Sequence, residues 1–137
     1  MAARFATSLA PGQAGATVVV LSGELGAGKT MFVQEIARTL GIVETMTSPT
    51  FVLEKVYALK NQRFSRLIHL DAYRLKGPHE LEMLGWRELL KDAGNLIILE
   101  WPERVEGAIP PHVIGIRFDI VDHGRIITID DKREETA

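Results

Sequence analysis

Runs of consecutive apolar residues recur along the chain, separated by stretches with helical or alternating spacing. The runs at residues 17–22, 66–70 and 96–99 are short and apolar, which is typical of strands buried on both faces of a sheet. Residues 51–57 and 113–120 alternate between apolar and polar positions, as half-buried strands do. The pattern predicts a sheet with a covered centre and more exposed margins.

Helical spacing follows the first apolar run. Apolar residues at positions 32, 33, 36, 37 and 40 recur three and four positions apart, and Gly41 stands where the helix is expected to end. A second helical region begins at Gly77-Pro78, carries several leucines, and is broken near Gly85. The remaining connections are a predicted loop over 45–50, a hairpin tip at 61–63, and a turn at 122–124 that leads into a last strand over 125–129.

Length and composition are those of one globular domain over residues 1–137, with 46% apolar and 25% charged positions. The charged residues 130–137 are predicted to fray. The sequence has no cysteine, which excludes thiol catalysis, Cys-ligated zinc and a disulfide framework.

The net charge is −2 and the pI is about 6.1, so the chain lacks the positive charge of an autonomous nucleic-acid binder. The N-terminus shows no signal-peptide pattern, and no run reaches the roughly 18 apolar residues of a membrane span. We expect a cytoplasmic protein without membrane contact, in which any RNA is held by another protein.

One motif carries specific chemistry. The segment 23–30 matches the phosphate-binding loop pattern of Gly, four residues, Gly, Lys, then Ser or Thr. Small residues let backbone N–H groups approach a polyphosphate, the lysine reaches the β and γ phosphates, and the threonine hydroxyl binds Mg²⁺. The loop lies between a predicted strand and a predicted helix, the context that supports the motif. The predicted nucleotide-binding residues here are Gly23, Glu24, Leu25, Gly26, Ala27, Gly28, Lys29 and Thr30.

Two carboxylates close apolar strands. Glu100 follows the run 96–99, and a strand beside the loop's strand would deliver its carboxylate to the metal and the γ-phosphate. Its candidate roles are to bind the metal directly, to bind it through water, or to polarise an attacking water. Asp71 closes the run 66–70 and is the competing metal ligand, in which case Glu100 is structural. We predict that Glu100 and Thr30 bind Mg²⁺ while Asp71 positions water, so the predicted catalytic residues are Lys29, Asp71 and Glu100.

Other polar and aromatic residues have both a functional and an ordinary interpretation. Thr50 either senses the γ-phosphate or belongs to a simple turn. His69 is either a packing residue or half of a metal pair with Asp71. Trp101 either covers the site or packs in the core. The candidate transition-state arginines are Arg74, Arg87 and Arg104.

These elements together predict an α/β fold. Its class is a P-loop NTPase-like three-layer domain, with a mixed, mainly parallel central sheet and antiparallel edge strands. Its predicted cofactors are a nucleotide and Mg²⁺.

The sequence resembles the bacterial TsaE (formerly YjeE) ATPases over most of its length, from Pro11-Gly12 to Gly124-Arg125. The family's marks occur in order and are more specific together than the phosphate loop alone. They are Gly-Glu-Leu-Gly-Ala-Gly-Lys-Thr at 23–30, Ser48-Pro49-Thr50-Phe51, His69-Leu-Asp71-Ala-Tyr73-Arg74-Leu75, Glu80-Leu81-Glu82, and Glu100-Trp101-Pro102.

The resemblance implies ATP binding with Mg²⁺ on Thr30 and Glu100, a required carboxylate at Asp71, and slow hydrolysis. It also implies action with TsaD and TsaB in placing threonylcarbamoyl on adenosine 37 of tRNA, with tRNA contacted only through that complex. TsaC-type enzymes make the threonylcarbamoyl-adenylate, and TsaD transfers the group.

Two features depart from the family pattern. Met1 corresponds to a position within the family's first helix, so the resemblance does not carry over the N-terminal strand and threonine that help hold adenosine. Met31, which we count among the nucleotide-binding residues, stands where many members have a second threonine. Arg125, in a Gly-Arg turn shared with the family, is expected to border the adenosine.

Two other functions fit the phosphate loop. A small metabolite kinase would need an acceptor pocket and a lid, for which residues 73–90 are the candidate segment. A non-hydrolysing nucleotide-sensing adaptor would use ATP only to order Thr50 and its neighbours for docking. A GTPase is disfavoured because the sequence has no Asn-Lys-X-Asp element.

Overall fold

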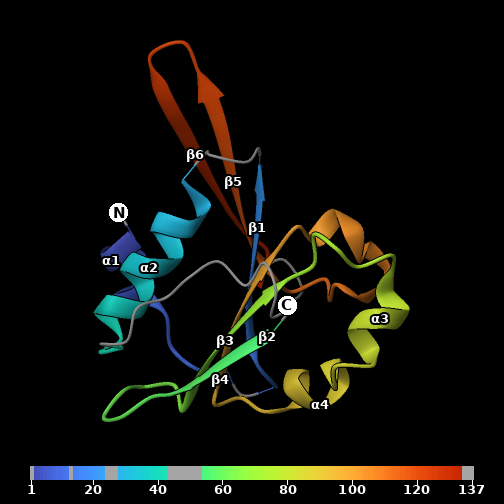
Figure 1. Ribbon diagram of the computed structural model, residues 1–137. Coiled ribbons are helices and arrows are strands. Elements are labelled where there is room, and N and C mark those ends of the chain that lie inside the picture. The colour runs from blue at the N-terminus through green and yellow to red at the C-terminus, as the bar shows by residue number, and fades with distance from the viewer. Residues whose placement is uncertain (1, 13, 24–27, 43–53, 134–137) are drawn as a thin grey trace.

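The computed structural model describes residues 2–12, 14–23, 28–42 and 54–133 (Figure 1). The helices are α1 (Ala2–Ser8), α2 (Lys29–Thr39), α3 (Pro78–Glu82) and α4 (Trp86–Lys91), with short 3₁₀ turns η1 (Pro102–Arg104) and η2 (Glu106–Ala108). The strands are β1 (Thr17–Gly23), β2 (Glu54–Ala58), β3 (Arg66–Asp71), β4 (Asn95–Glu100), β5 (Ile114–Val121) and β6 (Gly124–Asp131).

The strands form one sheet in the order β2-β3-β4-β1-β5-β6. The inner strands β3, β4, β1 and β5 run parallel, whereas β2 and β6 pair antiparallel at the two edges. The predicted mixed, mainly parallel sheet with antiparallel edge strands is confirmed. The strand that ends in Glu100 lies directly beside the strand that leads into the phosphate loop, as predicted.

Alternation along the central strands sends apolar side chains to both faces of the sheet. Val19 and Leu21 of β1 pack under α1 and α2, while Val18 and Val20 pack toward α3 and α4. Figure 1 shows these helix pairs on opposite sides of the sheet. The apolar run of β1 is therefore buried on both faces, which is why it does not alternate with polar residues.

Helix α2 begins and ends at glycines with positive φ. Gly28, at its N-cap, has φ of 100°, and Gly41, just beyond its end, has φ of 85°. The N–H of Gly41 bonds the carbonyl of Arg38 at 3.1 Å, and the N–H of Ile42 bonds that of Ala37 at 3.0 Å. This is the Schellman arrangement, so the predicted helix end at Gly41 is confirmed.

The second helical region is divided as predicted. Gly85, with φ of 82°, separates α3 from α4. Leu81 and Trp86 are buried in the core between α3, α4 and the sheet. The Trp86 indole N–H donates to the carbonyl of Ala108 at 2.9 Å.

The β5–β6 hairpin extends beyond the rest of the domain (Figure 1). Strand β6 reaches Asp131, and the N–H of Lys132 bonds the carbonyl of Val113 at 3.0 Å. The prediction that fraying starts at residue 130 is therefore wrong for Asp130 and Asp131, because cross-strand pairing outweighs the charge of the two aspartates.

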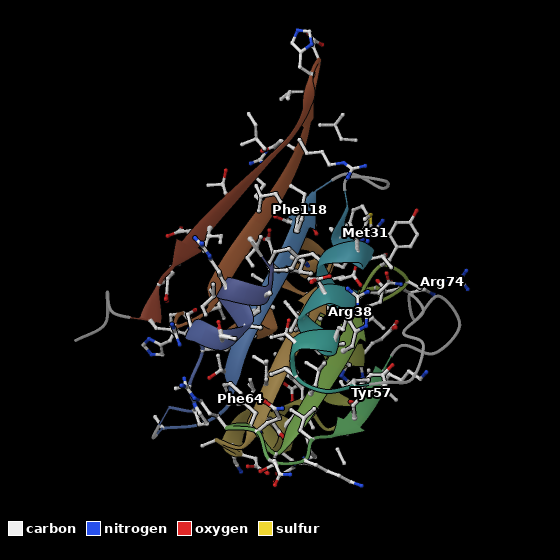
Figure 2. The ribbon with its side chains drawn as sticks, turned by 90° about the vertical axis from the view of Figure 1, so that its left-hand side faces the viewer. Met31, Arg38, Tyr57, Phe64, Arg74 and Phe118 are labelled. Carbon is white, nitrogen blue, oxygen red and sulfur yellow. The ribbon has the colours of Figure 1, made fainter. Side chains whose placement is uncertain are left out.

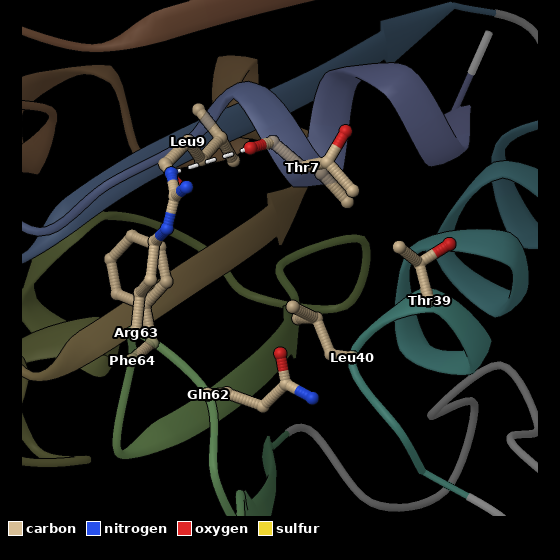
Figure 3. A pocket seen from close by; sticks show the side chains of 8 residues that line it. Thr7, Leu9, Thr39, Leu40, Gln62, Arg63 and Phe64 are labelled. Carbon is tan, nitrogen blue, oxygen red and sulfur yellow. Dashed lines mark hydrogen bonds between the residues drawn. The ribbon is translucent and has the colours of Figure 1, made fainter.

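Helix α1 is attached to the turn between β2 and β3. Arg63 Nη1 donates to the carbonyls of Thr7 and Leu9 at 3.4 and 3.3 Å, beside a cavity of about 130 Å³ (Figure 3). Thr39 and Leu40, at the C-terminal end of α2, also line this cavity. The cavity lies away from the phosphate loop, since the 11 residues of α2 span roughly 16 Å.

Within the described residues, no helix is long and apolar enough to cross a membrane.

Candidate functional site

Three strand ends meet the start of α2. The C-terminal ends of β1, β3 and β4 lie side by side, with Leu21 opposite Glu100 and Asp71 opposite Glu100 in the register. Gly23 ends β1 and Lys29 begins α2. The structure therefore brings together Lys29, Asp71 and Glu100, the residues predicted to be catalytic.

The acidic side chains lie on the face of the sheet that α2 covers. Leu67 of β3 and Ile98 of β4 both belong to the core on that face. Side chains two residues apart on a strand share a face, so Asp71 and Glu100 project to the same side. That side also holds His69, which sits between Leu67 and Asp71.

Two glycines of the loop are required by backbone geometry. Gly23 has φ of 129°, and a Cβ atom built on it would lie 2.2 Å from the carbonyl oxygen of Phe118 on β5. A Cβ on Gly28 would lie 3.4 Å from Nη1 of Arg125. The hairpin that carries Arg125 therefore approaches the phosphate loop, as expected of a residue bordering a nucleotide there.

Lys29 is held among aromatic and acidic groups. It is only 5% exposed, its Nζ donates to the carbonyl of Gly23 at 3.0 Å, and Nζ lies 3.9 Å from the centre of the Trp101 ring. Burial lowers the pKa of Lys29, while Glu100, Glu103 and Asp71 act in the opposite direction by favouring its charged form. The site thus holds a cation among three carboxylates.

Trp101 lies under the lysine and not wholly within the core. Its backbone has φ of 61°, an unusual value for a bulky residue, and its ring centre lies 4.9 Å from that of Tyr73. The Arg104 guanidinium in turn lies 5.3 Å from the Tyr73 ring. The Lys29 contact favours the interpretation in which Trp101 covers the site, and Arg104 is the candidate arginine that reaches this stack.

Glu100 forms a buried bond with His69. Its Oε2 lies 2.6 Å from His69 Nε2, and the two residues are 3% and 2% exposed. His69 is buried, as a packing residue would be. Its Nε2 is also hydrogen-bonded to Glu100, the predicted metal ligand. No group of three or more potential metal-binding His, Cys, Asp or Glu side chains gathers among the described residues.

Asp71 is set in a less polar environment than a surface aspartate. Burial raises its pKa; the N–H of Tyr73, which donates to Oδ1 at 2.9 Å, opposes the rise. Glu100 raises the pKa of Asp71 further, while His69 and Lys29 lower it. A carboxylate with a raised pKa is a better proton acceptor than an ordinary one.

The other predicted site residues are distributed differently. Thr30 is partly buried in the first turn of α2, and Met31 is 67% exposed beside it. Figure 2 shows Met31 and Phe118 toward one end of the domain, with Tyr57 and Phe64 toward the other. The positions that lie outside the described residues are Glu24, Leu25, Gly26, Ala27 and Thr50.

The segment proposed as a kinase lid packs into the fold. Leu75, Leu81 and Trp86 are each 4% exposed or less and belong to the core on the side of α3 and α4. Asp71 and Glu100 project to the other side of the sheet. Arg87 pairs with Glu82 at 3.5 Å and is 81% exposed. Leu75, Leu81 and Trp86 thus anchor the candidate segment 73–90 to the far side of the sheet, while Tyr73 at its start packs against Trp101.

Comparisons with known proteins identify a family. The sequence profile of the family described as "Threonylcarbamoyl adenosine biosynthesis protein TsaE" matches residues 1–127. The tRNA threonylcarbamoyladenosine biosynthesis protein TsaE of Treponema pallidum is 40% identical over 114 residues, which are 82% of this chain and 81% of that protein. The protein of the same name from Borreliella burgdorferi is 36% identical over 114 residues, covering 82% and 80% of the two chains.

A solved structure is similar as well. The crystal structure of Bacillus subtilis YdiB superposes with a TM-score of 0.73 at 28% identity, covering 96% of this chain and 76% of that one. Both the family profile and the identities extend over most of the sequence. The chain therefore belongs to the TsaE family of tRNA threonylcarbamoyladenosine biosynthesis proteins.

Proposed function

We propose that this protein is a Mg²⁺-dependent ATPase of the TsaE type, which binds and slowly hydrolyses ATP to support a TsaD–TsaB complex in modifying tRNA. The observation that carries the proposal is the grouping of Lys29, Asp71 and Glu100 around the start of α2, where the phosphate-loop sequence ends.

The binding role falls to the loop and to α2. The N-terminus of a helix presents unpaired N–H groups and a partial positive charge, both suited to phosphate oxygens. Gly23 lacks the Cβ atom that would meet the Phe118 carbonyl, and Gly28 has φ of 100°, which favours glycine. Lys29 supplies the positive charge for the β and γ phosphates, and we assign Arg125, which lies near Gly28, to border the rest of the nucleotide.

The donor set suits Mg²⁺, which prefers carboxylate and hydroxyl oxygens and keeps several water ligands. Bound Mg²⁺ would neutralise charge that develops on the phosphate oxygens. We assign Thr30 and Glu100 to hold it. Asp71, whose pKa is raised by burial, is assigned to position the attacking water and to accept a proton from it.

The charge of the chain and the names of its relatives favour coupling to partners. The net charge of −2 argues against direct capture of tRNA. The Treponema and Borreliella relatives are tRNA threonylcarbamoyladenosine biosynthesis proteins by name, which supports a role in that modification. The assignment of TsaD and TsaB as partners rests on the family resemblance.

The test is ATPase activity measured with and without purified TsaD and TsaB, for the wild type and for Glu100→Ala. We expect the partners to stimulate the wild type and the variant to stay inactive. A lack of stimulation would refute the coupling, and full activity of Glu100→Ala would refute its role. Tight ATP binding with normal support of tRNA modification but no hydrolysis would instead favour the sensing adaptor.

A further inference from the structure

The buried partner of Glu100 has no role in the function proposed above. His69 lies on β3, two residues before Asp71, and Asp71 is opposite Glu100 in the register. His69 is therefore a diagonal neighbour of Glu100 on the next strand, within reach of a long side chain.

The contact between the two side chains is short and shielded from water. A carboxylate only accepts hydrogen bonds, so Nε2–H of His69 donates to Oε2 of Glu100, at 2.6 Å. Both residues are 3% exposed or less, which leaves little competition from solvent. A glutamate has three rotatable side-chain bonds, and this bond holds the end of the side chain in one place.

We propose that His69 is a positioning residue: it holds Oε2 of Glu100 so that the other carboxylate oxygen is presented to the Mg²⁺ bound with the nucleotide. The inference rests on the proposed role of Glu100 as a metal ligand. Removing a group that orients a metal ligand in this way typically lowers the metal affinity by about 10-fold to 100-fold.

A second buried polar residue provides the matched control. Asn95 is 0% exposed, lies at the opposite end of the same strand as Glu100, and donates from Nδ2 to the carbonyl of Leu89 at 3.0 Å. Like His69, whose Nδ1 has no hydrogen-bond partner within the described part of the chain, Asn95 has one unpartnered atom there, Oδ1. Asn95→Leu removes the hydrogen bond of another buried polar side chain, away from the site.

Two substitutions separate positioning from packing. In His69→Gln the amide nitrogen comes close to the position of the imidazole Nε2 and keeps a donor for Glu100. In His69→Asn the side chain is one methylene shorter and does not reach Oε2, although it remains polar.

The measurement is the affinity for a non-hydrolysable ATP analogue, by calorimetry, in Mg²⁺ and in EDTA. The ratio of the two affinities gives the coupling between metal and nucleotide. We expect His69→Asn to lower this ratio by about 10-fold or more, with its affinity in EDTA unchanged. The wild type, His69→Gln and Asn95→Leu should share the same higher ratio.

The outcomes distinguish the inference from the function on which it rests. A wild-type ratio near one would overturn the metal role of Glu100 and the inference with it. A normal wild-type ratio that His69→Asn leaves unchanged would overturn only the positioning role, as would an equal loss in Asn95→Leu. Should His69→Asn not fold, His69→Gln decides: retained coupling supports the inference and lost coupling overturns it.

Discussion

Replacing Gly23 by alanine tests how the sheet shapes the start of the phosphate loop. Gly23 has φ of 129° and is opposite Phe118 in the β1–β5 register. Its added methyl group would lie 2.2 Å from the Phe118 carbonyl oxygen and 3.1 Å from the Phe118 Cβ atom. Because the nearest atom belongs to the backbone of a central strand, β5 itself would have to move.

Two contributions set the expected loss of stability. Holding alanine at a strongly positive φ costs about 1–3 kcal/mol. Forcing an extra methyl into a packed contact costs about another 1–3 kcal/mol. We therefore expect the free energy of unfolding of Gly23→Ala to fall by about 2–6 kcal/mol, a large part of the stability of a small domain.

Gly124→Ala provides the control, because Gly124 has φ of 139° but no atom within 4 Å of a built Cβ. Only the backbone contribution of about 1–3 kcal/mol should appear there. The assay is equilibrium unfolding in urea followed by circular dichroism, with the slope compared between variants. Equal losses in Gly23→Ala and Gly124→Ala would refute the close approach of Phe118.

The remaining predictions concern the charged centre. Burial raises the pKa of Asp71 above its ordinary value of 3.8, so its ionised form destabilises the folded state. Asp71→Asn should therefore raise the Tm at pH 7. Thermal unfolding measured at decreasing pH should show this gain in Tm disappearing below about pH 3.8. An equal gain at pH 3 would contradict this reasoning. A double-mutant cycle of Lys29→Met and Trp101→Leu, measured by urea unfolding, should give a coupling of about 0.5–2 kcal/mol from the cation–π contact, and additive effects would contradict it. Glu100→Ala and Asp71→Ala should each abolish ATP hydrolysis while nucleotide binding persists; phosphate release and calorimetry test this, and full turnover in either variant would remove that residue from the mechanism.

Much of the fold could be predicted because single residues punctuate the pattern. Gly41 ends α2 and Gly85 divides the second helical region, at the positions that the sequence predicted, and both have positive φ. The central strands are identifiable because they are buried on both faces. Strand β6 was predicted too short, since pairing with β5 outweighs the local preference of its terminal aspartates.

The site was predictable as a set of residues but not as a set of contacts. The motif and the strand ends identified Lys29, Asp71 and Glu100 because parallel strands deliver their C-terminal residues to one edge. The bond between His69 and Glu100 depends on the register of two strands far apart in sequence, which periodicity does not contain. One signal was present: His69 and Asp71 are two positions apart on a strand and so share a face.

The most direct test of the account is calorimetric titration of ATP with Mg²⁺ into the wild type and into Lys29→Ala. We predict saturable binding to the wild type and a large loss of affinity in the variant, because the lysine at the start of α2 supplies the positive charge for the phosphates. Absence of binding heat in the wild type, or equal binding by the variant, would contradict the claim that this loop holds the nucleotide.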